Sequence, residues 1–399
     1  MRHPTTSDIC PHCGRGPSSR DALVAIIQTL RAMALDQVLT GWRWLALCHA
    51  IAGLLLVHHG ASAVRVARAL PGVSHDRLTR LLRERAIPTR LMAGLRQVAQ
   101  ALGPAIWIID DVIVPKPAMR TLAWAKGLWC PAEQRYVHAI NIVVLLGCWG
   151  PIRIPLGFRL WCPKEQVTGY APGYSYRTKL LLARDLVAEA LADGLRCQYV
   201  TFDSWYTARP VTGYLEAQGI RWYGAIAANH KVVLHGQTQR VDALERRVHT
   251  WQARRIGHAV ASADVYSARL GQVRLTRVRI SQPKRPYLYL VTNDRSSTPS
   301  QAWACKRRRW PIEPLFRDAK QLLSLASCQS PQVEAQETHI ALVLVAWVVL
   351  QRLRQAPSQT AGEVQAELVA TVWGHTTRFS APGSDSLSRL PDSQGVRIP

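Results

Sequence analysis

Acidic residues are scarce in this chain compared with basic ones. The 399 residues include 50 Lys and Arg but only 26 Asp and Glu, which gives a net charge of +24 and a pI near 10.4. An excess of this size predicts a polyanionic partner, and nucleic acid is the commonest one. Hydrophobic residues make up 48% and charged residues 19%, a balance that excludes wholesale disorder. The length is sufficient for two or three domains with a sizeable core.

Long hydrophobic runs are also lacking. No stretch reaches the roughly 20 consecutive apolar residues of a membrane-spanning helix. The nearest, "IALVLVAWVVL" at 340–350, predicts a buried helix. The N-terminus, "MRHPTTSDICPHC", has no apolar region of the kind found in secretory signals. We therefore expect no membrane partner. We expect instead a cytoplasmic protein with reduced thiols.

Paired cysteines are almost absent. The chain has nine cysteines, but only Cys10 and Cys13, in "CPHC", have a pair spacing. One such pair is half of a zinc site, which His12, His3 or a partner chain would have to complete. The Pro- and Ser-rich composition of residues 1–20 favours the alternative, a disordered N-terminal extension.

Residues 21–103 show apolar residues at helical spacing and predict an all-helical N-terminal DNA-binding domain. Within it, "GASAVRVARALPGVSHDRLTRLLRERA" (60–86) predicts a helix ending near Leu70, a turn, and a second helix capped by Ser74. This layout is typical of a helix-turn-helix. The alternative is a helical hairpin with a solvated basic face. The outward residues of the recognition helix would be His75, Arg77, Arg80, Arg83 and Arg85.

From residue 104 the pattern changes to three strands, a helix, a strand, a helix and a strand. This order predicts an α/β protein with a ribonuclease-H-like core, preceded by the helical domain. The segments are "AIWIIDDVIV" (105–114), "RYVHAINIVVLLGCW" (135–149), "IRIPLGFRLWC" (152–162), 176–194, "CQYVTFD" (197–203), 206–219 and 220–227.

Residues 104–228 would form the first part of this core. Residues 229–295 alternate Val, Thr and Arg with polar residues and predict a β-rich insertion. Helices at 298–309, 311–326 and 334–355 would complete the core within residues 296–356. The Ser-, Pro- and Gln-rich remainder, 357–399, predicts a largely disordered tail.

Carboxylates stand out at three places in this core. Asp110 and Asp111 lie in the middle of an apolar strand, where alternation directs them to opposite faces. At least one must then be buried, which is costly without a partner. Asp203 ends the fourth strand and Glu313 lies early in a helix. In a ribonuclease-H-like order the first and fourth strands are neighbours, so these carboxylates would converge.

Converging carboxylates repel each other and need a counter-charge. Two divalent ions about 3.5–4 Å apart would supply it, and oxygen ligands select Mg²⁺ or Mn²⁺. Each carboxylate also has a simpler reading. Asp203 could be a turn or cap residue, and the Asp pair could accept backbone hydrogen bonds. Glu313 could pair with Arg309 or Arg317 on its own helix.

These residues resemble the DDE transposases of bacterial insertion sequences, in particular the insertion sequence four family. That family carries Tyr, two residues, Arg, three residues, Glu, six residues and Lys. Arg309, Glu313 and Lys320 match the last three, and Lys306 occupies the Tyr position. "IDDVIVPK" and "DSWYT" resemble the first two acidic motifs, with Val112 in place of a usual Thr. The likeness covers roughly residues 60–355.

The resemblance implies a DNA transposase that binds terminal inverted repeats, cuts with Asp110, Asp203 and Glu313 as metal ligands, and joins 3′-hydroxyls to target DNA as a homodimer. Asp111 remains an alternative to Asp110. Trp251 is the candidate for stacking a flipped base, and a core aromatic is its alternative. The expected DNA-phosphate contacts are Lys306, Arg309, Arg317 and Lys320. Two other functions remain open, a transposase-derived DNA-binding protein that does not cut and a metal-dependent DNA nuclease on the same fold.

Overall fold

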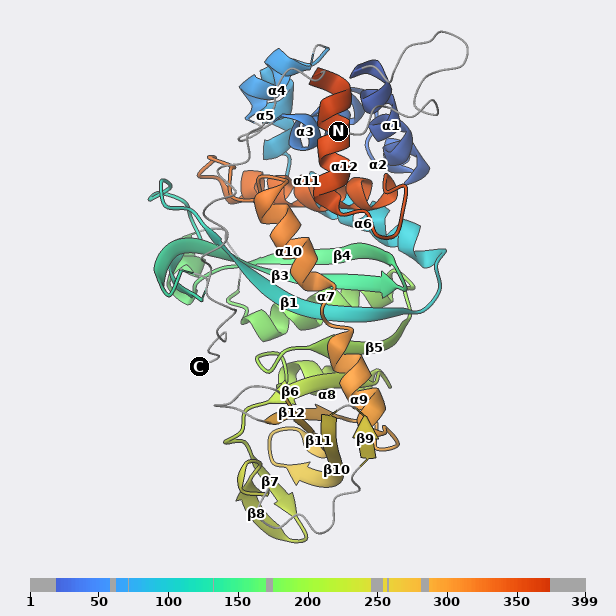
Figure 1. Cartoon of the computed structure of the whole chain (residues 1–399). Coiled ribbons are helices and arrows are strands. Elements are labelled where there is room, and N and C mark those ends of the chain that lie inside the picture. The colour runs from blue at the N-terminus through green and yellow to red at the C-terminus, as the bar shows by residue number, and fades with distance from the viewer. Residues whose placement is uncertain are drawn as a thin grey trace, which may run out of the picture.

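The structure is a computed structural model. It describes residues 19–57, 62–70, 72–131, 133–169, 175–244, 254–256, 258–280 and 287–373. Cys10, Cys13 and Trp251 lie outside these residues, so the zinc and base-stacking predictions stay predictions. The described part is a mixed α/β structure in which a large mixed sheet adjoins a helical layer (Figure 1).

One twelve-stranded sheet runs through the molecule. Its strand order is β2-β3-β1-β5-β6-β12-β11-β10-β7-β8, with β4 paired to β3 and β9 paired to β10. The strands are β1 (Ala105–Pro115), β2 (Lys126–Cys130), β3 (Arg135–Trp149), β4 (Ile152–Trp161), β5 (Cys197–Phe202), β6 (Trp222–Ile226), β7 (Lys231–Leu234), β8 (Gln237–Arg240), β9 (Arg254–Ile256), β10 (His258–Ser267), β11 (Gly271–Arg279) and β12 (Tyr287–Thr292).

The strand that carries the Asp pair lies at the centre of the first half of the sheet. β1 pairs antiparallel with β3 and parallel with β5. The predicted neighbourhood of the first and fourth strands is therefore confirmed. Ile109 lies opposite Phe202, the last residue of β5. Asp110 and Asp203 each come one residue later, so the parallel register brings both carboxylates to the same level of the sheet.

The β-rich segment extends the same sheet. β12 pairs antiparallel with β6, and β11 and β10 follow as an antiparallel meander. The alternation that predicted strands at 229–295 is explained by one face packing on the core. Val273 and Leu275 of β11 are fully buried there, as is Val291 of β12.

Helices cover the sheet and form a separate layer above it (Figure 1). α11, which contains the apolar run at 340–350, is the buried core helix that the sequence predicted. By length and composition it could cross a membrane, but 89% of its apolar window is buried. The helices are α1 (Ser19–Ala32), α2 (Leu35–Val38), α3 (Gly41–Leu56), α4 (Ala63–Ala69), α5 (His75–Arg83), α6 (Ala86–Gln100), η2 (Lys164–Gly169, 3₁₀), α7 (Lys179–Ala192), α8 (Arg209–Ala217), α9 (Pro299–Arg307), α10 (Ile312–Gln321), α11 (Val333–Arg352) and α12 (Ala361–Trp373).

α12 corrects one prediction, because it lies inside the segment expected to be largely disordered. The Thr360 hydroxyl accepts from the Glu363 backbone N–H, and the Glu363 carboxylate accepts from the Thr360 backbone N–H at 2.7 Å. This reciprocal pair is a capping box that starts the helix. Ala361 and Val364 are then buried against α1, α3 and α11. The polar composition after Ala356 predicted disorder, although a short helix with one buried face lies in this segment.

The predicted helix-turn-helix segment forms two short helices. α4 ends at Ala69, and α5 begins after Ser74, whose hydroxyl accepts from the Arg77 backbone N–H. Leu78 and Leu81 are buried. The five outward residues of the prediction are all exposed: His75, Arg77, Arg80, Arg83 and Arg85.

Candidate active site

Asp110 and Asp203 meet beyond the carboxyl end of β5. The Asp110 side chain is only 15% exposed. One of its oxygens accepts from the Asp111 backbone N–H at 2.9 Å, and the other binds the Arg309 guanidinium. Asp203 accepts the backbone N–H groups of Trp205 at 2.9 Å and Tyr206 at 3.3 Å. Asp203 is therefore a turn residue, as one alternative predicted, and the turn orients its carboxylate beside Asp110.

Glu313 is connected to Asp110 through a shared cation, the Arg309 guanidinium. It lies in the first turn of α10 and binds Arg309 at 2.7 Å, the i,i+4 partner that the sequence offered. The same guanidinium binds Asp110, 199 residues away in the chain. Arg309 thus bridges the central strand and the helix. Its side chain is only 17% exposed, while that of Glu313 is 42% exposed.

Charge around the two Asp side chains is incompletely compensated. Burial, followed by the Asp203 charge, raises the pKa of Asp110 to about 7, although Arg309 opposes the shift. Burial also raises the pKa of Asp203, while the Tyr206 backbone N–H and the nearby Lys306 and Arg309 lower it. Both carboxylates therefore lie where an additional positive charge would be stabilising. This is the electrostatic setting of a cation-binding or catalytic site.

Asp111 points to other partners. It binds the Lys179 ammonium at 2.9 Å, the Tyr206 hydroxyl at 2.9 Å and the Asn141 amide at 2.6 Å. Lys179 begins α7, which packs on β3 and β4, whereas α10 lies across β1 on the near side in Figure 1. The two adjacent carboxylates thus face different elements. Asp111 is fully partnered and holds the loop after β5 through Tyr206.

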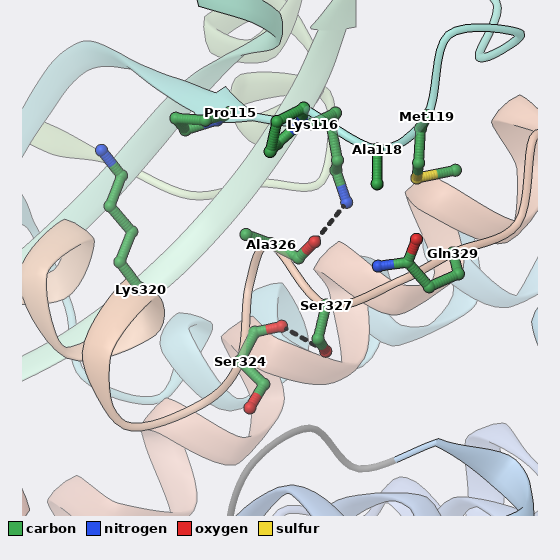
Figure 2. A pocket seen from close by; sticks show the side chains of 10 residues that line it. Pro115, Lys116, Ala118, Met119, Lys320, Ser324, Ala326, Ser327 and Gln329 are labelled. Carbon is green, nitrogen blue, oxygen red and sulfur yellow. Dashed lines mark hydrogen bonds between the residues drawn. The ribbon is translucent and has the colours of Figure 1, made fainter. Parts of the chain in front are cut away.

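The four predicted phosphate contacts fall in different surroundings. Lys306 lies among the carboxylates, and burial followed by the Arg309 charge lowers its pKa to about 8. Arg309 binds Asp110 and Glu313. The exposed Arg317 side chain contacts Asp318 at 3.3 Å. Lys320 borders a pocket of about 440 Å³ between the end of β1 and the loop after α10 (Figure 2).

The side chains at the site decide whether the expected metal ion could bind there. Among the described residues, no three His, Cys, Asp or Glu side chains form a group that could hold a metal. Arg309 lies between Asp110 and Glu313, which explains why the three expected ligands are not directly grouped. Asp110 and Asp203 nevertheless offer oxygen ligands with too little counter-charge. That chemistry fits a hard divalent cation.

Two exposed tryptophans beside the carboxylates were not predicted as site residues. Trp205 is 61% and Trp310 is 66% exposed. The Lys179 ammonium lies 4.9 Å from the Trp205 ring centroid. Each tryptophan is within three residues of an acidic residue of the site, Asp203 or Glu313. That spacing, in a strongly basic chain, was the available signal for an aromatic contact with nucleic acid.

The comparisons with known proteins give one family. No curated protein matches the chain. Among solved structures, the NurA nuclease from Sulfolobus solfataricus is 10% identical and covers 52% of this chain and 73% of its own, with a TM-score of 0.26. That likeness is too low to support any argument. A family described as "DDE superfamily endonuclease" matches residues 27–282, well over half of the 399 residues. The chain therefore belongs to the DDE superfamily endonucleases.

Proposed function

We propose that the chain is a DNA transposase similar to the insertion sequence four family. It would bind the terminal inverted repeats of a mobile element, cut the DNA ends and join their 3′-hydroxyls to target DNA. One observation carries this proposal. Asp110 in β1 and Asp203, directly after the parallel neighbour β5, lie at the same level of the sheet, and Arg309 binds both Asp110 and Glu313. The order β4-β3-β1-β5-β6, in which β3 pairs antiparallel with both β4 and β1, also fits a ribonuclease-H-like core.

DDE endonucleases depend on divalent metal ions, and the proposed ligands in this chain are Asp110, Asp203 and Glu313. Two Mg²⁺ or Mn²⁺ ions would supply Lewis acidity and neutralise charge on the scissile phosphate. Arg309 is placed to exchange a carboxylate for a DNA phosphate, because a guanidinium binds either group through the same two-pronged contact. Lys306 would add a second cation at the same phosphate.

DNA recognition is assigned to α5 and its neighbours. The helix presents basic side chains to solvent while Leu78 and Leu81 hold it on the helical layer. A capped helix of this kind can enter the major groove, with arginines reading base edges or contacting phosphates. Since a mobile element has two ends, we propose that a homodimer pairs them.

A second function is favoured by two departures from the resemblance. Lys306 stands at the Tyr position and Val112 at the Thr position of the family pattern. A copy that has lost these contacts could bind DNA without transposing it, or cut DNA as a nuclease on the same fold. Joining of a cut end to a second DNA separates transposase from nuclease.

Cleavage of a labelled DNA that carries the element's own end, with Mg²⁺ or Mn²⁺, tests the proposal. Wild type would be compared with Asp110→Asn, Asp203→Asn and Glu313→Gln, and with Asp242→Asn as a control at a carboxylate that pairs with Arg240. We expect wild type and the control to cut and join, and the other three to bind without cutting. Binding by wild type without cleavage in either metal would refute the transposase and nuclease readings alike.

A further inference from the structure

Lys116 is a lysine buried at the end of the strand that carries Asp110. It directly follows β1, and only 2% of the residue is exposed. Its ammonium donates to the backbone carbonyls of Ala326 at 3.0 Å and Cys328 at 3.1 Å, and neither partner is charged. Figure 2 shows the side chain directed into the loop that follows α10. Lysine is almost never fully buried without a paired charge, so an apolar residue would ordinarily be expected here.

The loop that Lys116 binds is firmly connected to α10. The Leu325 backbone N–H donates to the Ala319 carbonyl in the last turn of that helix at 2.9 Å. From the other side, α11 holds the loop through two buried side chains. Gln336 donates to the carbonyls of Cys328 and Ser330, and His339 contacts the Ser324 carbonyl. Movement of this loop relative to β1 would therefore carry α10 with it.

β1 and α10 are the elements that carry the carboxylates. Asp110 lies six residues before Lys116 on the strand, and Glu313 lies in the first turn of α10. Within the site, Arg309 connects these two carboxylates. Arg309 is also the group that must change partners when a phosphate or a metal ion arrives. A second connection that does not take part in binding would keep the strand and the helix in register during that exchange.

We propose that Lys116 is a positioning residue for the carboxylate site. Its ammonium ties the end of β1 to the loop after α10 and so sets the distance between the strand carboxylates and Glu313. A buried ammonium suits this role, because one group donates to two loop carbonyls, that of Ala326 and that of Cys328, which it shares with Gln336. The inference rests on the proposed function for its catalytic consequence, but the tether itself is a structural claim that can be tested alone.

The principal variant is Lys116→Met, which keeps the length of the side chain and removes the donors. Lys164→Met is the matched control, because Lys164 is an exposed lysine in η2. Hydrogen exchange without metal or DNA gives the first result. We expect faster exchange in Lys116→Met across α10 and residues 322–330, with β3 unchanged, and no change in the control. Unchanged exchange of α10 would refute the tether, whether or not the protein cuts DNA.

Cleavage gives the second result. We expect Lys116→Met to bind the DNA end within about twofold of wild type in metal-free buffer. Its maximal cleavage rate should fall about 100-fold, the scale expected for a displacement near 1 Å, and it should need more Mn²⁺ for half-maximal rate. A rate that falls only in proportion to the folded fraction, with an unchanged Mn²⁺ requirement, would refute positioning. If wild type itself does not cut, the proposed function fails, and hydrogen exchange still decides the tether.

A rescue experiment guards against a folding defect. Lys116→Ala would be purified with propylammonium, which can occupy the vacated space and donate to the same carbonyls. Propylammonium should restore slow exchange in α10 and the cleavage rate, while tetramethylammonium, which has no donor, should not. Equal effects of the two cations, or no effect of either on the exchange of α10, would contradict the assignment.

Discussion

Replacing Asp110 by Asn should make the protein more stable at neutral and alkaline pH. The carboxyl has its pKa raised from 3.8 to about 7, chiefly by burial and then by the Asp203 charge. A carboxyl whose pKa is higher in the folded state costs stability as the pH rises from the lower value to the higher one. Three pKa units correspond to an upper limit of about 4 kcal/mol. Because Asp110 and Asp203 share the cost of burying negative charge, we expect Asp110→Asn to gain about 2–4 kcal/mol of stability at pH 8 and almost none at pH 4.

Denaturant unfolding of wild type and Asp110→Asn at pH 4 and pH 8, without divalent metal, measures this difference. Asp318→Asn is the matched control. That carboxylate is also buried, but it accepts from the Trp347 indole at 3.2 Å and contacts Arg317, so its removal should give no gain at pH 8. Added Mn²⁺ should stabilise wild type more than Asp110→Asn. If Asp110→Asn is no more stable than wild type at pH 8, the Arg309 contact outweighs burial and the reasoning is wrong.

Three further outcomes follow from the site and the DNA-binding helix. Arg309→Lys should lower the cleavage rate about 100-fold while DNA affinity falls much less, because one ammonium does not span both Asp110 and Glu313; single-turnover assays measure the rate. Arg77→Ala should reduce the salt dependence of DNA binding by about one phosphate contact, whereas Arg240→Ala in β8 should not, as titrations at several salt concentrations would show. Burial lowers the pKa of Lys306 to about 8, so DNA affinity should fall between pH 7 and pH 9, and Lys306→Arg should remove that fall. An unchanged profile in the variant would exclude Lys306 as the titrating group.

Much of the fold could be read from local patterns. Ser74 marks the start of α5, because a hydroxyl before an amphipathic run caps a helix. The order of strands and helices was enough to place β1 beside β5. Both inferences depend on short-range chemistry or on topology rules, and a single sequence is enough to apply either.

Other features depend on long-range contacts that no local pattern records. The two residues of the capping box, Thr360 and Glu363, were present in the sequence. The packing of α12 against α1 and α3, which buries it, could not be predicted from them. The apolar alternation of 229–295 predicted strands, but not that β12 would join β6 and continue the main sheet. Composition predicts whether a segment can pack, and only the partner decides whether it does.

The choice between Asp110 and Asp111 shows how far the sequence alone can lead. Alternation along β1 assigns the two carboxylates to opposite faces, but both faces of a central strand are covered, so periodicity has no preference. The structure supplies a chemical difference. Asp111 has three side-chain donors, from Lys179, Tyr206 and Asn141. Asp110 has one backbone N–H, that of Asp111, and shares its one cation, the Arg309 guanidinium, with Glu313. A carboxylate already saturated by donors has little left to offer a cation, and one that lacks counter-charge gains most from it. This difference in charge compensation favours Asp110 for the proposed metal site, while Asp111 holds the loop that carries Asp203.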